Sequence, residues 1–157
     1  AWSCARAADA VDDYSLPITL AERAVELDSD NVSKLFVLGA VLYRAGCFDE
    51  AIAQLSEAES QLRHNDPKRY RNRPPVANLY FLAMTHQRLG HQDEARKCYD
   101  KASAWTRDVL APESEDGTTK PSATWDIRLT HELLRAETEQ LLGIAAAETT
   151  PEQGAPQ

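Results

Sequence analysis

Residues 43–52 read Tyr-Arg-Ala-Gly-Cys-Phe-Asp-Glu-Ala-Ile, and residues 87–96 read Gln-Arg-Leu-Gly-His-Gln-Asp-Glu-Ala-Arg. The Arg, the Gly, the Asp-Glu pair and the Ala each recur 44 residues after their first occurrence. A Gly that ends one helix in the left-handed conformation, followed by two acidic residues that open the next, is typical of a tight corner. The repeated stretch therefore predicts two helix hairpins, with corners at Gly46 and Gly90.

Apolar residues on both sides of each corner recur at the spacing of one helix face. Before the first corner they follow an i, i+3, i+4, i+7 pattern, and after it they continue every three or four residues. The same register recurs 44 residues later and, in weaker form, 34 residues earlier. Small residues at Gly39, Ala51 and Ala58 predict that paired helices approach each other closely. No long run of alternating β-branched residues is present, so we expect no sheet.

The pattern resembles the tetratricopeptide repeat, a 34-residue helix hairpin with the consensus W-x2-L-G-x2-Y…A-x3-F…P. Residues 32–63 match best, residues 76–108 match well, and residues 1–29 are a degenerate copy. The matching positions are Leu35, Leu38, Gly39, Leu42, Ala51, Leu55 and Ala58, then Leu79, Leu82, Ala83, Ala95 and Tyr99. Leu replaces the consensus Trp and Tyr in the best unit, and the closing Pro is missing from all three units. The resemblance implies an all-α, right-handed helix-hairpin solenoid.

Two phrases carry a narrower resemblance, to repeat regions of large planctomycete proteins that include serine/threonine kinases. They are Ala-Val-Leu-Tyr-Arg-Ala-Gly at residues 40–46 and Leu-Ala-Met-Thr-His-Gln-Arg-Leu-Gly at residues 82–90. The chain also begins with Ala rather than Met, so we expect it to be a segment of a longer protein. One reading of its function is therefore a structural spacer or regulatory region of a kinase-type enzyme whose catalytic domain lies outside this chain.

One more amphipathic helix is predicted after the repeats, over about residues 123–142, and Gly143 ends it. A helix in this place covers the apolar end of a solenoid. The residues that follow are mostly Ala, Glu, Thr, Pro and Gln, a composition that predicts a disordered tail over residues 143–157. We therefore predict a single repeat domain over residues 1–142.

The 157 residues carry a net charge of -8, which disfavours nucleic acid and anionic membranes as partners. No apolar stretch is long enough to cross a bilayer and no signal peptide is present, so we expect a cytoplasmic protein. One segment, residues 63–73, is basic, with five basic residues against one acidic residue. Its residues Lys68, Arg69, Arg71 and Arg73 form a loop, because nearby prolines forbid a continuous helix. This basic loop is either a solvated connector or a site for a phosphopeptide or a base.

The sequence contains no motif that predicts catalysis, a cofactor or a metal. His86 and His91 are five residues apart across Gly90, a spacing at which we do not expect them to converge on one metal ion. His86 replaces a core Leu, so we expect it to be packed and hydrogen-bonded. Cys47 and Cys98 are interpreted as structural residues rather than nucleophiles. We therefore expect no enzyme activity and no cofactor.

The first helix of each unit lines the concave surface of such a solenoid, and this surface is the predicted binding site. Its candidate residues, named the concave face here, are Phe36, Tyr43, Arg44, Tyr80, Met84, Gln87 and Arg88. Aromatic residues, Met and Arg are enriched at protein-binding surfaces, so we expect a peptide or partner domain. The alternative is that the aromatic residues only pack between units. Related repeats bind chaperone C-terminal tails with a carboxylate clamp of Lys, Asn and Arg. Phe36, Tyr80 and Met84 stand here where Lys and Asn would be needed, so such tails are excluded.

Overall fold

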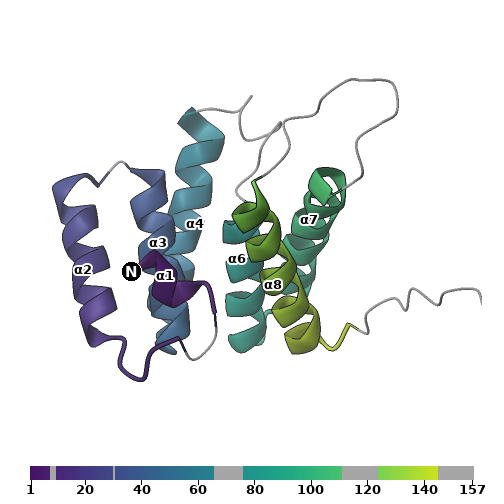
Figure 1. Cartoon of the computed structure of the whole chain (residues 1–157), viewed down its shortest axis with the longest axis horizontal. Helices are drawn as coiled ribbons and strands as arrows, with labels where there is room; N and C mark the ends of the chain where they lie inside the picture. The colour runs from purple at the N-terminus through teal and green to yellow at the C-terminus, as the bar shows by residue number, and fades with distance from the viewer. Residues whose placement is uncertain (8–9, 30, 66–75, 111–123, 145–157) are drawn as a thin grey trace, which may run out of the picture.

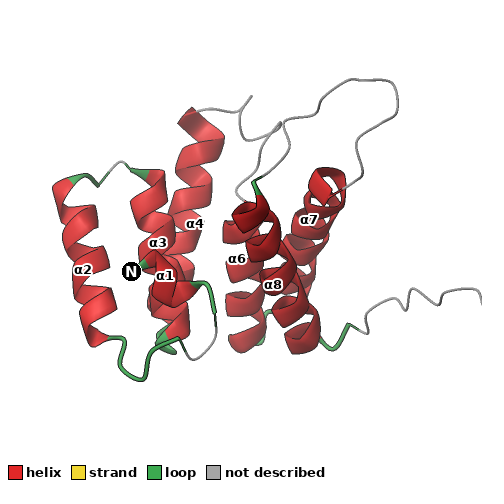
Figure 2. Cartoon of the chain, viewed as in Figure 1, coloured by secondary structure: helices red, strands yellow, loops and turns green. Residues whose placement is uncertain are grey.

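The structure, a computed structural model, describes residues 1–7, 10–29, 31–65, 76–110 and 124–144. These ranges contain seven helices and no strand (Figures 1 and 2). The helices are α1 (Trp2–Ala5), α2 (Ser15–Leu27), α3 (Val32–Arg44), α4 (Phe48–Asn65), α6 (Val76–Arg88), α7 (Gln92–Leu110) and α8 (Trp125–Leu142). The predicted all-α helix-hairpin solenoid is confirmed. The basic loop residues Lys68, Arg69, Arg71 and Arg73, and residues 145–157 of the predicted tail, lie outside the described residues.

Both predicted corners join antiparallel helices, α3 to α4 and α6 to α7. Gly46 and Gly90 have φ angles of 81° and 80°, in the left-handed region that Gly adopts without a steric penalty. The backbone N–H of the next residue donates to a carbonyl of the preceding helix, at 3.0 Å in the first corner and 2.9 Å in the second. This is the Schellman arrangement that ends a helix at a Gly. The acidic pair follows each time in the first turn of the next helix.

The two helices of the first hairpin are in close contact at Gly39 of α3. A Cβ atom at this position would lie 2.6 Å from Cγ of Leu55 on α4. Leu55 is fully buried, and its carbonyl oxygen accepts a hydrogen bond of 3.1 Å from Nδ2 of Asn78 on α6. The same stretch of α4 therefore contacts both its own hairpin partner and the next hairpin.

The helices of residues 1–29 differ in length. In the degenerate first unit, α1 covers only four residues, whereas the equivalent helix of the next unit, α3, has 13. Its partner α2 is a full helix, opened by Asp13, whose carboxylate accepts from both the backbone N–H and the hydroxyl of Ser15. Pro17 lies in the first turn of α2, where no helical hydrogen bond is lost. Both helices pack against α3.

Helix α8 ends at Gly143, which has a φ angle of 66°, as its sequence predicts. It packs chiefly against α6 and to a smaller extent against α7. Toward the preceding hairpin, in contrast, the repeat helix α6 packs more against the second helix, α4, than against the first, α3. Helix α8 is therefore displaced toward the first helix of the preceding hairpin, on the same side of the repeats as α1 (Figure 1).

Candidate functional site

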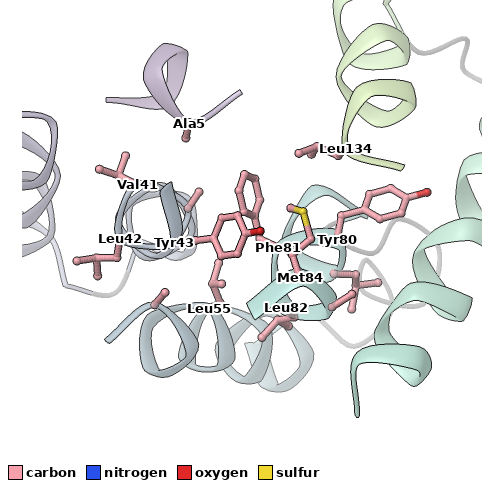
Figure 3. Close-up of a cluster of buried hydrophobic side chains, with 14 of the residues drawn as sticks. Ala5, Val41, Leu42, Tyr43, Leu55, Tyr80, Phe81, Leu82, Met84 and Leu134 are labelled. Carbon is pink, nitrogen blue, oxygen red and sulfur yellow. The ribbon is translucent and has the colours of Figure 1, made fainter. Parts of the chain in front are cut away.

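The structure brings the predicted concave-face residues together but does not leave them open. Tyr80 and Met84 are 0% exposed, and Tyr43 is buried. Arg44 retains 4% of its side-chain exposure, while Phe36 and Gln87 are half-buried and Arg88 alone is exposed. In this structure these residues therefore do not line an open groove, because α1 and α8 cover them. Figure 3 shows Ala5 of α1 above α3 and Leu134 of α8 beside Tyr80 and Met84.

Helix α1 closes one part of the concave face with an aromatic cluster. The ring centroids of Trp2 and Phe36 are 5.0 Å apart, and each ring also faces Phe81, at 6.5 Å and 6.1 Å. Tyr43 meets the same Phe81 ring edge-on at 5.6 Å. Phe81 is fully buried at the centre of this cluster. Tilted and edge-on contacts of this kind add stability beyond the burial of the rings.

Arg44 connects α3 to both covering helices. Its Nε donates to the carbonyl oxygen of Ala5 at 2.9 Å, and its Nη1 and Nη2 both donate to the carboxylate of Glu137, Nη2 at 2.7 Å. The guanidinium carbon also lies 5.3 Å from the Phe81 ring centroid and 5.5 Å from that of Tyr43. A bidentate carboxylate and two aromatic faces satisfy this buried cation. Arg44 is therefore paired with a carboxylate of the covering helix α8.

A second polar cluster holds α8 against the last hairpin. The Tyr99 hydroxyl donates to Oε1 of Glu139 at 2.6 Å, and Nε of Arg135 donates to the same oxygen at 2.7 Å. Burial raises the pKa of the Glu139 carboxyl, but the hydrogen bonds from Tyr99 and Arg135 outweigh it and leave that pKa lowered. Glu139 is therefore an anion at neutral pH.

The neighbouring Tyr80 is a structural residue. Its hydroxyl shares a hydrogen bond of 2.8 Å with Oγ1 of Thr106. Burial raises the pKa of Tyr80 to about 12, although the bond to Thr106 acts in the opposite direction. The phenol therefore stays neutral.

The two covering helices also contact each other. Nη2 of Arg6, just after α1, donates to Oγ1 of Thr130 at 2.8 Å and to the carbonyl oxygen of Asp126 at 3.4 Å. The two segments that flank the repeats therefore meet over the concave face. These contacts join residues 120 and 124 positions apart, and no local pattern predicts them.

A family model named "Anaphase-promoting complex, cyclosome, subunit 3" matches residues 12–102, more than half of the chain. The chain belongs to this family. It is thus a tetratricopeptide-type repeat protein. No curated protein and no solved structure matches it significantly.

The part of the chain that matches subunit 3 of the anaphase-promoting complex runs from before α2 into α7. Both covering helices, α1 and α8, lie outside that part. The family therefore accounts for the repeats, whereas the elements that fill the concave face come from the flanking sequence.

Among the functional residues that sequence reasoning missed, Glu137 and Glu139 left a signal. They lie in the C-terminal half of α8, where the helix dipole disfavours acidic side chains, and no basic residue occupies its last turn. Acidic residues in that position indicate a cationic or hydrogen-bonding partner elsewhere. Trp2 and Arg6 carry no comparable signal, because they lie beside a helix of four residues.

The two histidines at the second corner lie close together. The Nδ1 atoms of His86 and His91 are 3.4 Å apart. His86 is half-buried. Burial lowers the pKa of its imidazole, and repulsion from His91 lowers that pKa further.

No group of three or more potential metal ligands occurs among the described residues. None of the described helices is long and apolar enough to cross a membrane. Burial also raises the pKa of the Cys98 thiol to about 11, which disfavours a nucleophilic thiolate.

Proposed function

We propose that the chain is a non-catalytic protein-interaction module whose concave face holds a peptide or partner domain. The observation that carries this proposal is the way in which α8 packs: the concave face already binds this helix through a bidentate Arg44–Glu137 ion pair and apolar contacts. The family name describes a subunit of a multi-protein complex, which supports a role in protein association. Repeats of this type generally lack catalytic activity, which supports a module without chemistry of its own.

The exposed rim of the concave face supports the same proposal. Arg88 is exposed and occupies the same repeat position as Arg44, while Gln87 beside it is half-buried. Burial raises the pKa of the Tyr43 phenol, and the Arg88 guanidinium nearby opposes that shift. Arg88 thus lies next to the aromatic cluster with an exposed side chain, and Arg recognises carboxylates with geometric specificity.

A second candidate is a structural spacer or regulatory region of a larger kinase-type enzyme. The covered concave face favours it, because Tyr80 and Met84 contact only this chain's own helices as it stands. In that case α1 and α8 are permanent parts of the fold.

Affinity capture with variants that keep the fold distinguishes the two candidates. The wild-type chain, a Gln87→Ala, Arg88→Ala variant and a matched Arg23→Ala control are used as bait in an extract of the source organism. Arg23 suits as a control because it is exposed on α2, in an ion pair of 2.6 Å with Glu26. We expect one partner to be retained by the wild type and the control, and weakened about 30-fold or more by the rim variant. Equal retention by all three baits, or no retained protein, favours the spacer.

A further inference from the structure

Helix α8 presents an acidic, amphipathic pattern to the repeats. Leu134 and Thr138 are fully buried, Leu141 is half-buried, and their spacing of four and three residues places them on one helix face. Glu137 and Glu139 flank that face and bind Arg44 and Tyr99. The pattern that the concave face recognises is therefore Leu-x-x-Glu-x-Glu-x-Leu, residues 134–141.

The Arg44–Glu137 ion pair makes the binding of a helix to the concave face specific, rather than a matter of apolar contact alone. A buried ion pair contributes little net stability compared with apolar residues of the same volume, but leaving one partner unpaired is costly. Arg44 is therefore satisfied by a helix with a carboxylate at this position and opposes a helix without one. Selection of this kind suits a surface that binds one class of helix.

Helix α8 is not fully complementary to the concave face. Nδ1 of His131 is buried and has no hydrogen-bond partner among the residues that the structure describes, which costs stability for as long as α8 is bound. The opposite face of the helix is not packed either: Trp125 is 78% exposed, Leu133 50% and Leu129 43%. A helix held along one face, with an unpaired polar atom, is one that a better-matched helix can replace.

We propose that the concave face is a receptor for acidic amphipathic helices, and that α8 is its resident occupant, which a partner helix of the same pattern replaces. The inference rests on the proposed function and names the partner class for that site. The replacement is a binding exchange in which no covalent bond changes. Because α8 is tethered to α7 through residues 111–123, it competes at a high effective concentration, in the millimolar range for a short linker. The resident helix therefore reduces the apparent affinity for any free helix.

The test uses a fluorescein-labelled synthetic peptide with the sequence of residues 124–144 and measures its fluorescence anisotropy with the full chain. Glu137→Lys places a cation beside Arg44 and so weakens the resident helix without changing the receptor. Glu132→Lys makes the same charge change at an exposed position of α8 and is the matched control. We expect the peptide to bind the Glu137→Lys chain about tenfold or more tightly than it binds either the wild type or the control.

A peptide carrying Glu137→Lys and Glu139→Lys tests the chemistry of recognition. It is expected to bind the Glu137→Lys chain at least about tenfold more weakly than the unmodified peptide. Equal affinity of the unmodified peptide for all three chains overturns the proposal. Equal affinity of the two peptides overturns the selection for acidic helices and with it the proposal.

A second measurement covers the case in which Glu137→Lys does not fold. The wild-type chain is labelled with nitrogen-15 and observed by NMR while excess unlabelled peptide is added. We expect the amide signals of α8 to move to those of a released segment, while the signals of α4 persist. Unchanged α8 signals at millimolar peptide overturn the proposal.

The proposed function and this inference fail separately. If a partner is captured through Gln87 and Arg88 but the peptide never displaces α8, the protein-interaction module stands and the helix exchange is overturned. If the peptide displaces α8 but the extract yields no partner, the helix receptor stands and the proposed role in protein association is overturned.

Discussion

Replacing Gly39 with Ala tests the closest contact in the fold. The added methyl carbon would lie 2.6 Å from Cγ and 2.8 Å from Cδ2 of Leu55, distances that real Cβ atoms essentially never show. The Leu55 side chain cannot move into solvent, because it is fully buried. The backbone nitrogen of Leu55 is also only 3.1 Å away, so helices α3 and α4 must move apart.

The expected loss of stability is the balance of two terms. Overpacking a well-packed core costs about 1–3 kcal/mol, and the involvement of the α4 backbone favours the upper half of that range. Ala stabilises a helix interior by about 1 kcal/mol relative to Gly. We therefore expect Gly39→Ala to lower the free energy of unfolding by about 1–2 kcal/mol. For a chain of this size, each kcal/mol lowers Tm by about 2–4 °C.

Urea denaturation followed by circular dichroism measures this effect, and a double-mutant cycle assigns it to Leu55. Leu55→Ala alone is expected to cost about 2–5 kcal/mol, because it leaves a cavity. In that background the methyl group of Gly39→Ala enters vacated space, so the second change becomes stabilising by about 1 kcal/mol. If Gly39→Ala instead raises the stability of the wild-type chain, the helices are not in close contact and the reasoning is refuted.

Three further predictions concern buried polar groups. Tyr80→Phe removes the partner of the buried Thr106 hydroxyl, so the free energy of unfolding in urea is expected to fall by about 1–3 kcal/mol; an unchanged value would show that the bond contributes nothing. Burial lowers the pKa of both His86 and His131, so the unfolded chain binds more protons than the folded one below about pH 6.5. Tm is expected to fall between about pH 7 and pH 5, less steeply in His131→Gln, and a flat profile contradicts this. With its pKa raised to about 11, the Cys98 thiol is expected to react with iodoacetamide far more slowly at about pH 8 than a free thiol, whereas rapid labelling would mean an accessible thiolate.

The hairpins are predictable from the sequence because their determinants are local. A left-handed Gly with an acidic pair after it specifies a corner between two helices, and the apolar register specifies which helix faces meet. Gly46 and Gly90 adopt the expected conformation, and Gly39 lies at the expected close contact. The helical spacing and the repeat resemblance together also predict that Tyr43, Arg44 and Tyr80 share one face.

What covers that face depends on the tertiary structure. The spacing of apolar residues indicates that α8 is amphipathic, but it does not distinguish a helix at the end of the solenoid from one that lies over α6. That choice is made by contacts between distant residues, Arg44 with Glu137, Tyr99 with Glu139 and Arg6 with Thr130. Since the free energy of each contact exists only when the two segments that it joins are already in place, no window of sequence contains it. The sequence by itself therefore determines a repeat protein with an aromatic, arginine-bearing face, and the tertiary structure determines that the chain fills this face with its own helix.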